Sequence, residues 1–199
     1  MAKLVNWHQF ETKMKEKRFF LFSSFDARKV FPISPVASSF LLYRYAKKGF
    51  ILRVKRGLYA FPDALPPEVY IANRLCDPSY VSLQFALSYH GIIPETVYEI
   101  TSITPKTTRR YDTLGKTFSY RRITKNAFTG YAIEKQKDFG FKIADPEKAL
   151  VDTLYFRLAD EAGPMDRFNK EKINFAKAVA YANLFKNSKL TDFVKQTLK

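Results

Sequence analysis

The sequence predicts an α+β protein with two domains, residues 1–64 and residues 65–199, and three observations support this prediction. The apolar residues recur with a helical period up to about residue 48, and after Gly49 they alternate as in a β-hairpin. The segment Pro62–Pro67 contains three prolines, which is typical of a short, stiff linker between domains. Beyond it, helical and strand-like segments follow one another, which indicates a mixed α/β C-terminal domain.

Two helices are expected before residue 31. Over Asn6–Lys17 the apolar side chains recur at the spacing of one helical face, as in the series Trp7, Phe10 and Met14. A second, short helix is expected over Phe25–Val30, because the serines before it are favoured N-caps and a proline follows it. The apolar run between these two helices is expected only to pack beneath the second one.

A third helix is expected to begin at Ser34-Pro35, because serine at the N-cap and proline at the first helical position are favoured together. It should run to about Lys48, and Gly49 supplies a C-terminal stop. Helical spacing places the following side chains on or near one face: Ala37, Phe40, Leu41, Arg44 and Tyr45.

A β-hairpin is expected directly after the third helix. After Gly49 the side chains follow a period of two, in which Ile51, Arg53 and Lys55 alternate with Leu52 and Val54. Arg56-Gly57 can form a tight turn, and Leu58–Phe61 can return as the second strand. Three helices followed by a hairpin form the layout of a winged helix-turn-helix. The sequence therefore predicts this fold for the N-terminal domain.

The C-terminal domain is expected to contain both helices and strands. The helix expected at Asp145-Pro146 has a favoured N-cap and a proline in its first turn. The expected helices cover 68–75, 82–90, 146–158, 172–184 and 190–198, and the expected strands cover 97–104, 117–123, 128–134 and 139–143.

The net charge is +15, and it is concentrated in the first third of the chain. Residues 1–64 hold 13 Lys+Arg and 4 Asp+Glu, a balance of +9, whereas residues 65–199 hold 21 and 15, a balance of +6. Such a field attracts polyanions, because each neutralised phosphate releases counterions. We therefore expect a nucleic-acid site in the N-terminal domain, although a solvated basic surface would give the same balance.

Double-stranded DNA is the expected partner of this domain. Winged-helix proteins place the third helix in the major groove and let the hairpin contact the flanking backbone. The same residue types could instead cap the helix or remain solvated. The candidate DNA-binding residues are short hydrogen-bonding or cationic side chains, namely Ser34, Ser38, Ser39, Tyr43, Arg44, Lys47, Arg53, Lys55 and Arg56.

An RNA-binding module is an alternative. In the C-terminal domain, Arg109-Arg110 and Arg121-Arg122 lie near Tyr111 and Tyr120 in the sequence. Arginines beside aromatic rings permit phosphate contact and base stacking. The same residues could also be solvated charges on a hairpin, so a comparison of duplex DNA with structured RNA is needed to separate the two classes.

A nuclease-like enzyme is a weaker alternative. Asp145, Glu147, Lys148 and Asp152 form a loose group of carboxylates and a lysine, but a metal nuclease needs carboxylates that converge on one point. Here the proline and the spacing favour a helix start, with Asp145 as N-cap and Glu147 in the first turn. We therefore expect these residues to be structural.

No other pattern indicates an enzyme, a cofactor or a metal. Cys76 is the single cysteine, and a small buried side chain is its expected role. His8 and His90 are far apart in the sequence, and no glycine-rich phosphate loop is present. The chain contains neither a signal-peptide pattern nor a long apolar run, so we expect a cytoplasmic protein.

Four segments, in order over roughly residues 20–160, resemble the AbiEi-type antitoxins. Lys47–Phe61 (KKGFILRVKRGLYAF) resembles the family's signature at the wing. Pro78–Gly91 resembles its "PSYISLESAL" segment, Ile100–Thr104 its "TSVT" strand, and Ile143–Asp152 its "PEKALLD" helix start.

The resemblance implies a transcriptional repressor and antitoxin of a type IV toxin–antitoxin system used in phage defence. In this family the N-terminal winged helix represses the promoter of its own operon. The C-terminal domain opposes a toxin that resembles nucleotidyltransferases. We therefore expect a functional partner of that kind, without a prediction of direct contact.

Overall fold

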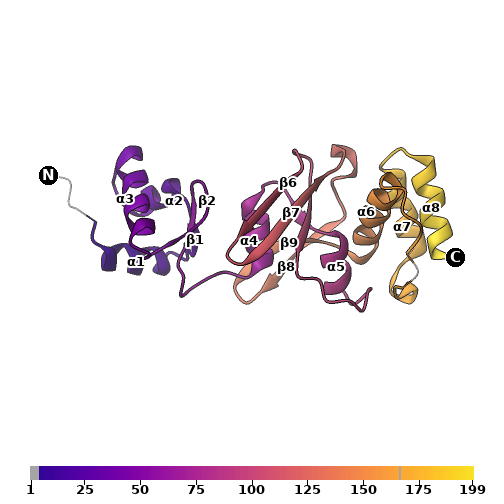
Figure 1. Cartoon of the computed structure of the whole chain (residues 1–199), viewed down its shortest axis with the longest axis horizontal. Helices are drawn as coiled ribbons and strands as arrows, with labels where there is room; N and C mark the ends of the chain where they lie inside the picture. The colour runs from indigo at the N-terminus through magenta and orange to yellow at the C-terminus, as the bar shows by residue number, and fades with distance from the viewer. Residues whose placement is uncertain (1–4, 166) are drawn as a thin grey trace. The chain divides into compact units, whose positions relative to one another are not determined.

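The computed structural model describes residues 5–165 and 167–199, and the chain divides into two compact units. Unit 1 is Met1–Pro67 and unit 2 is Glu68–Lys199, so the division falls at the end of the proline-rich linker. Each unit contains helices and a sheet (Figure 1). The predicted α+β class is therefore confirmed.

Unit 1 begins with helices whose N-termini are closed by local side chains. Asn6 and Ser34 cap the first and third helices, and Ser23 forms a reciprocal capping box with Asp26 at the second. Its elements are α1 (Trp7–Glu16), β1 (Leu21–Phe22), α2 (Ser24–Val30), α3 (Pro35–Lys47), β2 (Leu52–Lys55) and β3 (Leu58–Ala60).

The sheet of unit 1 has three strands in the order β1-β3-β2, and one of them was not predicted. Leu21 pairs with Ala60, so the apolar run before α2 is a strand rather than packing alone. A strand of two residues is too short to display a period in the sequence. Gly57 has φ +78° between β2 and β3, a value that favours glycine in this turn.

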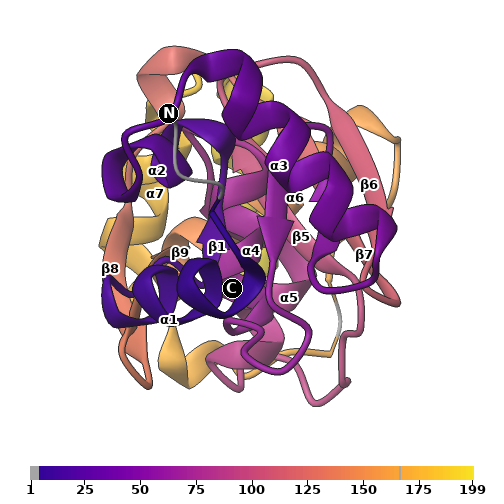
Figure 2. The same ribbon diagram turned by 90° about the vertical axis from the view of Figure 1, so that its left-hand side faces the viewer.

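The core of unit 1 is rich in aromatic residues and includes side chains from α1, α2 and α3. Figure 2 shows the backbone of these three helices. The rings of Phe10 and Phe31 stack with centroids 5.6 Å apart, and those of Phe22 and Phe61 lie 4.9 Å apart. These side chains come from α1, β1 and the ends of α2 and β3, so one cluster holds the helices and the sheet together. The helix α3 is thereby fixed by its inner face.

Unit 2 is built on a six-stranded sheet in the order β6-β7-β5-β4-β9-β8. Its helices are α4 (Glu68–Leu75), α5 (Leu83–Tyr89), α6 (Pro146–Ala159), α7 (Phe175–Asn183) and α8 (Ser188–Leu198), with short 3-10 turns η1 (Lys125–Ala127) and η2 (Lys170–Lys172). Its strands are β4 (Tyr80–Val81), β5 (Ile100–Thr104), β6 (Arg109–Thr113), β7 (Lys116–Arg122), β8 (Tyr131–Gln136) and β9 (Phe139–Ala144).

The sheet is mixed. β5 pairs with β7 and β4 pairs with β9 in parallel, whereas the other neighbouring strands are antiparallel. The sequence predicted neither β4 nor β6, and it predicted the strands around β5 and β8 to begin three residues too early. The helix over Glu68–Leu75 has the predicted limits.

Helices cover the centre of this sheet. α4 packs against β4, β5 and β9, and the buried Tyr120 hydroxyl donates to the Ala72 carbonyl at 2.6 Å. α5 packs against β5 and α6, while α6, α7 and α8 pack together (Figure 1). In the residues that the structure describes, none of the helices has the length and apolarity needed to cross a lipid bilayer.

Candidate nucleic-acid interface

The orientation of α3 is set by a buried stripe along its inner face. Leu41, Leu42 and Tyr45 lie in the core, and Ser38 is also fully buried. The Tyr45 hydroxyl donates to the Val5 carbonyl at 2.9 Å, and burial raises the pKa of this phenol, so it remains a neutral donor at physiological pH. The opposite face of α3 is therefore held toward solvent.

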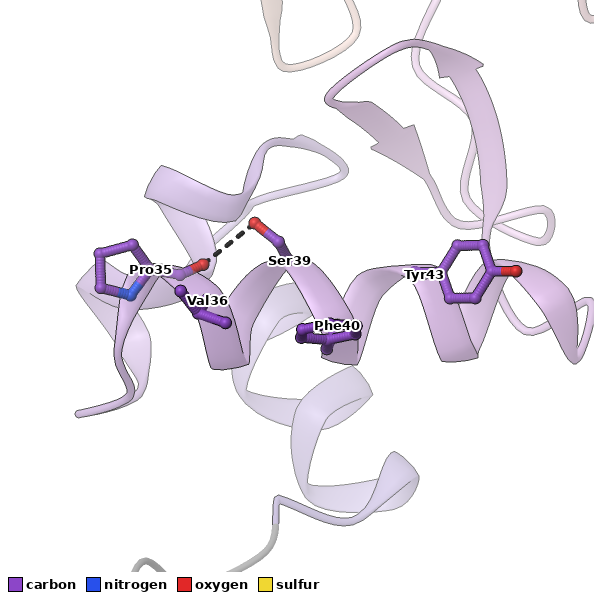
Figure 3. Close-up of a pocket in the computed structure, with 5 residues that line it drawn as sticks. All are labelled: Pro35, Val36, Ser39, Phe40 and Tyr43. Atoms are coloured by element: carbon purple, nitrogen blue, oxygen red, sulfur yellow. Dashed lines mark hydrogen bonds between the residues drawn. The ribbon is translucent and has the colours of Figure 1, made fainter.

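The three candidate serines differ in what they can contact. Ser38 is buried and its hydroxyl donates to the Pro35 carbonyl at 2.9 Å, so the prediction that Ser38 contacts DNA is wrong. The exposed Ser34 accepts from the Ala37 amide at 3.2 Å as the N-cap. Ser39 is also exposed, and its hydroxyl donates to the Pro35 carbonyl at 3.0 Å (Figure 3).

The outer face of α3 contains apolar side chains that the sequence analysis did not assign to the site. Val36 is 65% exposed and Phe40 66%, and Tyr43, one of the candidates, is 58% exposed. Figure 3 shows these three side chains along one side of the helix, where they line a shallow pocket with Pro35 and Ser39. Phe40 was expected beside Leu41 and Tyr45, but those two residues face the core.

The candidate cations lie at the end of α3 and on the hairpin. Arg44 and Lys47 are exposed in the last turns of α3, and Arg53 and Arg56 are exposed on β2 and the turn after it. Lys55 is half-buried on β2. Within residues 5–165 and 167–199, no carboxylate forms an ion pair with either arginine of the hairpin or with Arg44 or Lys47.

The positive charge of this surface is not neutralised from within its own segment. Residues 31–62, which include α3 and the hairpin, contain no aspartate or glutamate. Three of the four acidic residues of unit 1 are engaged elsewhere: Glu11 and Asp63 with Lys15, and Asp26 with Lys29. The result is a local cationic field around α3 and the hairpin, where a polyanion would be attracted.

Three of the residues considered for RNA binding have partners within unit 2. Tyr120 is fully buried, so it cannot stack on a base as that alternative requires. Arg121 pairs with Asp160 at 3.2 Å and lies over the Phe156 ring at 3.8 Å. Arg110 lies 3.4 Å from the Asp112 carboxylate on the same strand. Arg109 and Arg122 are exposed, so the ion pairs engage two of the four arginines considered for RNA binding.

The carboxylates considered for a nuclease have structural partners. Asp145 accepts from the Lys148 amide at 2.8 Å, which confirms its predicted role as N-cap of α6. Glu147 accepts from the Asn174 amide at 3.0 Å and pairs with Lys177 at 2.9 Å. Burial opposes its ionisation, but these two partners hold the pKa of Glu147 below its usual range.

The other two members of this group lie inside unit 2. Lys148 and Asp152 have no exposed side-chain surface and form an ion pair one turn apart on α6. Asp152 also accepts from the hydroxyls of Tyr80 at 3.0 Å and Ser82 at 2.8 Å. This pair therefore connects α6 to β4 and the start of α5. Among the described residues, no three His, Cys, Asp or Glu side chains are grouped as metal ligands.

Comparisons with known proteins inform the fold. No model of a protein family matches the sequence, and no curated protein matches it. Among solved structures, the chain is similar to the crystal structure of the RV2827C protein from Mycobacterium tuberculosis, with a TM-score of 0.59 and 13% sequence identity. The match covers 100% of this chain and 78% of that chain, and at this identity it supports the α+β fold alone.

Proposed function

We propose that the protein is a repressor that binds duplex DNA, with unit 1 as a winged helix-turn-helix. α3 is the recognition helix in the major groove, and the β2–β3 hairpin is the wing on the flanking backbone. The strongest support is the charge of residues 31–62. This segment has exposed cations on α3 and the hairpin and contains no aspartate or glutamate.

The wing residues are suited to phosphate. Arg53 on β2 and Arg56 in the turn after it are exposed, and a guanidinium can donate two parallel hydrogen bonds to one phosphate. Lys47 in the last turn of α3 supplies a further positive charge. Contacts of this kind position the protein on the duplex without reading its sequence.

We further propose that the repressor is the antitoxin of a type IV system that acts in the cytoplasm against a nucleotidyltransferase-like toxin. This proposal rests on the resemblance to AbiEi-type antitoxins. Three of the segments that resemble the family contribute β4, β5 and the end of β9, which are neighbours in the order β5-β4-β9. Separate stretches of resemblance therefore meet at the centre of unit 2.

DNA binding is tested by titrating the full chain against its own upstream duplex over a range of salt concentrations. Replacing Arg53 and Arg56 with alanine should weaken binding and lower the salt slope by up to about 1.8, since each lost phosphate contact lowers it by about 0.9. Lys189→Ala removes an exposed cation of unit 2 and should leave the slope unchanged. Tighter binding to structured RNA than to the duplex would contradict the proposal.

The antitoxin role is tested in cells that express the neighbouring toxin gene. The variant with both arginines replaced should lose repression of a promoter reporter but still protect the cells, because the substitutions lie on the surface of unit 1. Immunoblotting checks that both proteins accumulate equally. Loss of protection at normal protein levels would show that the two activities are not separate.

A further inference from the structure

The outer face of α3 is unusual for an exposed helix because it is apolar. Val36, Phe40 and Tyr43 recur at helical spacing on this face, and each is more than half exposed. Large apolar side chains are exposed to water at a cost unless something covers them, and a group of them marks a contact surface. The surface defined by Val36, Phe40 and Tyr43 is called the apolar face of α3 below.

The part of α3 that precedes Arg44 lacks every side chain that reads guanine or adenine by paired hydrogen bonds. Residues 34–43 contain no arginine, lysine, asparagine or glutamine. Those side chains make the bidentate contacts to purine edges in the major groove. The polar groups available on this stretch are hydroxyls, and that of Ser39 already donates to the Pro35 carbonyl.

One feature of the major groove matches this composition. Thymine presents a 5-methyl group there, and it is the only hydrocarbon group among the base edges of the groove. The cations at the end of α3 and on the hairpin provide the complementary charge for the phosphates on either side. An apolar face with cations beyond it therefore fits duplex DNA in which thymines face the helix.

A second copy of the chain is a less suitable occupant. At about 200 Å² for each large side chain, the exposed fractions of the three residues correspond to roughly 380 Å² of surface. One side of a stable protein–protein interface buries about 800 Å². The cations around the apolar face would also repel the same cations on a second copy.

We propose that the apolar face of α3 reads the 5-methyl groups of thymine in the major groove, with Val36 and Phe40 as the contacting side chains. This inference rests on the proposed DNA binding and adds its specificity. The target then contains thymine at the positions opposite these two side chains. Replacing thymine with uracil removes only the methyl group, so it tests this contact without altering base pairing.

The experiment uses the full chain and a duplex that it selects from a library of random sequences. Each thymine is replaced in turn with deoxyuridine, and affinity is measured at fixed salt. We expect a loss of about fourfold at one or more thymines, which corresponds to the burial of one methyl group. Phe40→Ala and Val36→Ala should bind more weakly and should lose this difference between thymine and uracil.

Arg53→Ala is the matched control. It should lower the affinity for both duplexes by the same factor and leave the ratio between thymine and uracil unchanged. Circular dichroism should show all variants folded, because Val36 and Phe40 are exposed.

Equal affinity for thymine and uracil at every position would overturn the inference while leaving the proposed function in place. Failure to bind any duplex at low salt would overturn both. Phe40→Ala could also keep the difference in affinity between the thymine and uracil duplexes but abolish a dimer that the parent chain forms in sedimentation. That result would overturn the inference and assign the apolar face of α3 to self-association.

Discussion

The buried pair Lys148–Asp152 gives the sharpest test of how unit 2 is held together. Asp152→Asn keeps the shape of the side chain but removes its charge, which leaves the Lys148 ammonium buried without a counter-ion. Removing one partner of a buried ion pair costs about 3–5 kcal/mol of the free energy of unfolding. With a urea m-value of about 2 kcal/mol/M, the unfolding midpoint of unit 2 should fall by roughly 1.5–2.5 M.

Two optical probes separate the units in this experiment. Trp7 is the single tryptophan of the chain and lies in unit 1, so its fluorescence reports on that unit. Circular dichroism follows the helices of both units. The fluorescence transition of Asp152→Asn should match that of the parent chain, while the dichroism transition gains an earlier phase.

Two more variants complete the cycle, namely Lys148→Met alone and the double variant. Adding Lys148→Met to Asp152→Asn removes the stranded charge, so the double variant should regain at least about 2 kcal/mol over Asp152→Asn alone. The hydroxyls of Tyr80 and Ser82 keep an acceptor in both variants. A loss below about 1 kcal/mol for Asp152→Asn, or strict additivity of the two substitutions, would refute the reasoning.

Two further substitutions test local features of unit 2. Gly130 has φ +77°, and a methyl group added there by Gly130→Ala would lie 2.8 Å from the Tyr181 ring. This substitution should lower the free energy of unfolding by roughly 2–5 kcal/mol. Gly115→Ala, at φ +69° in open space, should cost only about 1–2 kcal/mol, and equal losses would contradict the contact. Glu147→Gln should stay folded and lose roughly 1 kcal/mol at pH 7, because its partner Lys177 is partly exposed. Since the pKa of Glu147 is lowered by folding, its contribution exists above the unfolded pKa and disappears as pH falls through the folded one. The melting curves of Glu147→Gln and the parent chain should therefore converge only in acid, below the range in which glutamate ordinarily titrates. A difference that persists in acid would exclude the ion pair as its source.

The starts of α3 and α6 could be predicted because the signals that set them are local, whereas α7 begins three residues later than predicted. Ser34-Pro35 and Asp145-Pro146 each place an N-cap and a proline next to one another, and both helices begin there. β4 could not be predicted, since two residues contain no period and their pairing depends on distant strands. β6 is mostly exposed and polar, so only its partner β7 identifies it as a strand.

The exposure of the candidate site residues was predicted in part, because polarity was the only guide. The cations at the end of α3 and on the hairpin were identified because charge is visible in composition. Ser38 and Phe40 were assigned to the wrong faces of α3 because their burial is the reverse of what their polarity suggests. Ser38 is buried with its hydroxyl bonded to the Pro35 carbonyl, whereas Phe40 faces solvent. Polarity alone could not reveal this, whereas the buried spacing of Leu41 and Tyr45 would have indicated the outer face.

The placement of strand partners along the chain affects how the protein emerges from the ribosome. β1 of unit 1 is completed by β3, whose last residue is Ala60, so every partner of this unit is synthesised within the first 67 residues. In unit 2, β4 can pair with β9 only after β9 has been synthesised, and β9 ends at Ala144. At about 5–20 residues per second, unit 1 has several seconds to fold before the sheet of unit 2 can close. Nascent chains should therefore contain a finished first unit tethered to an unfinished second one.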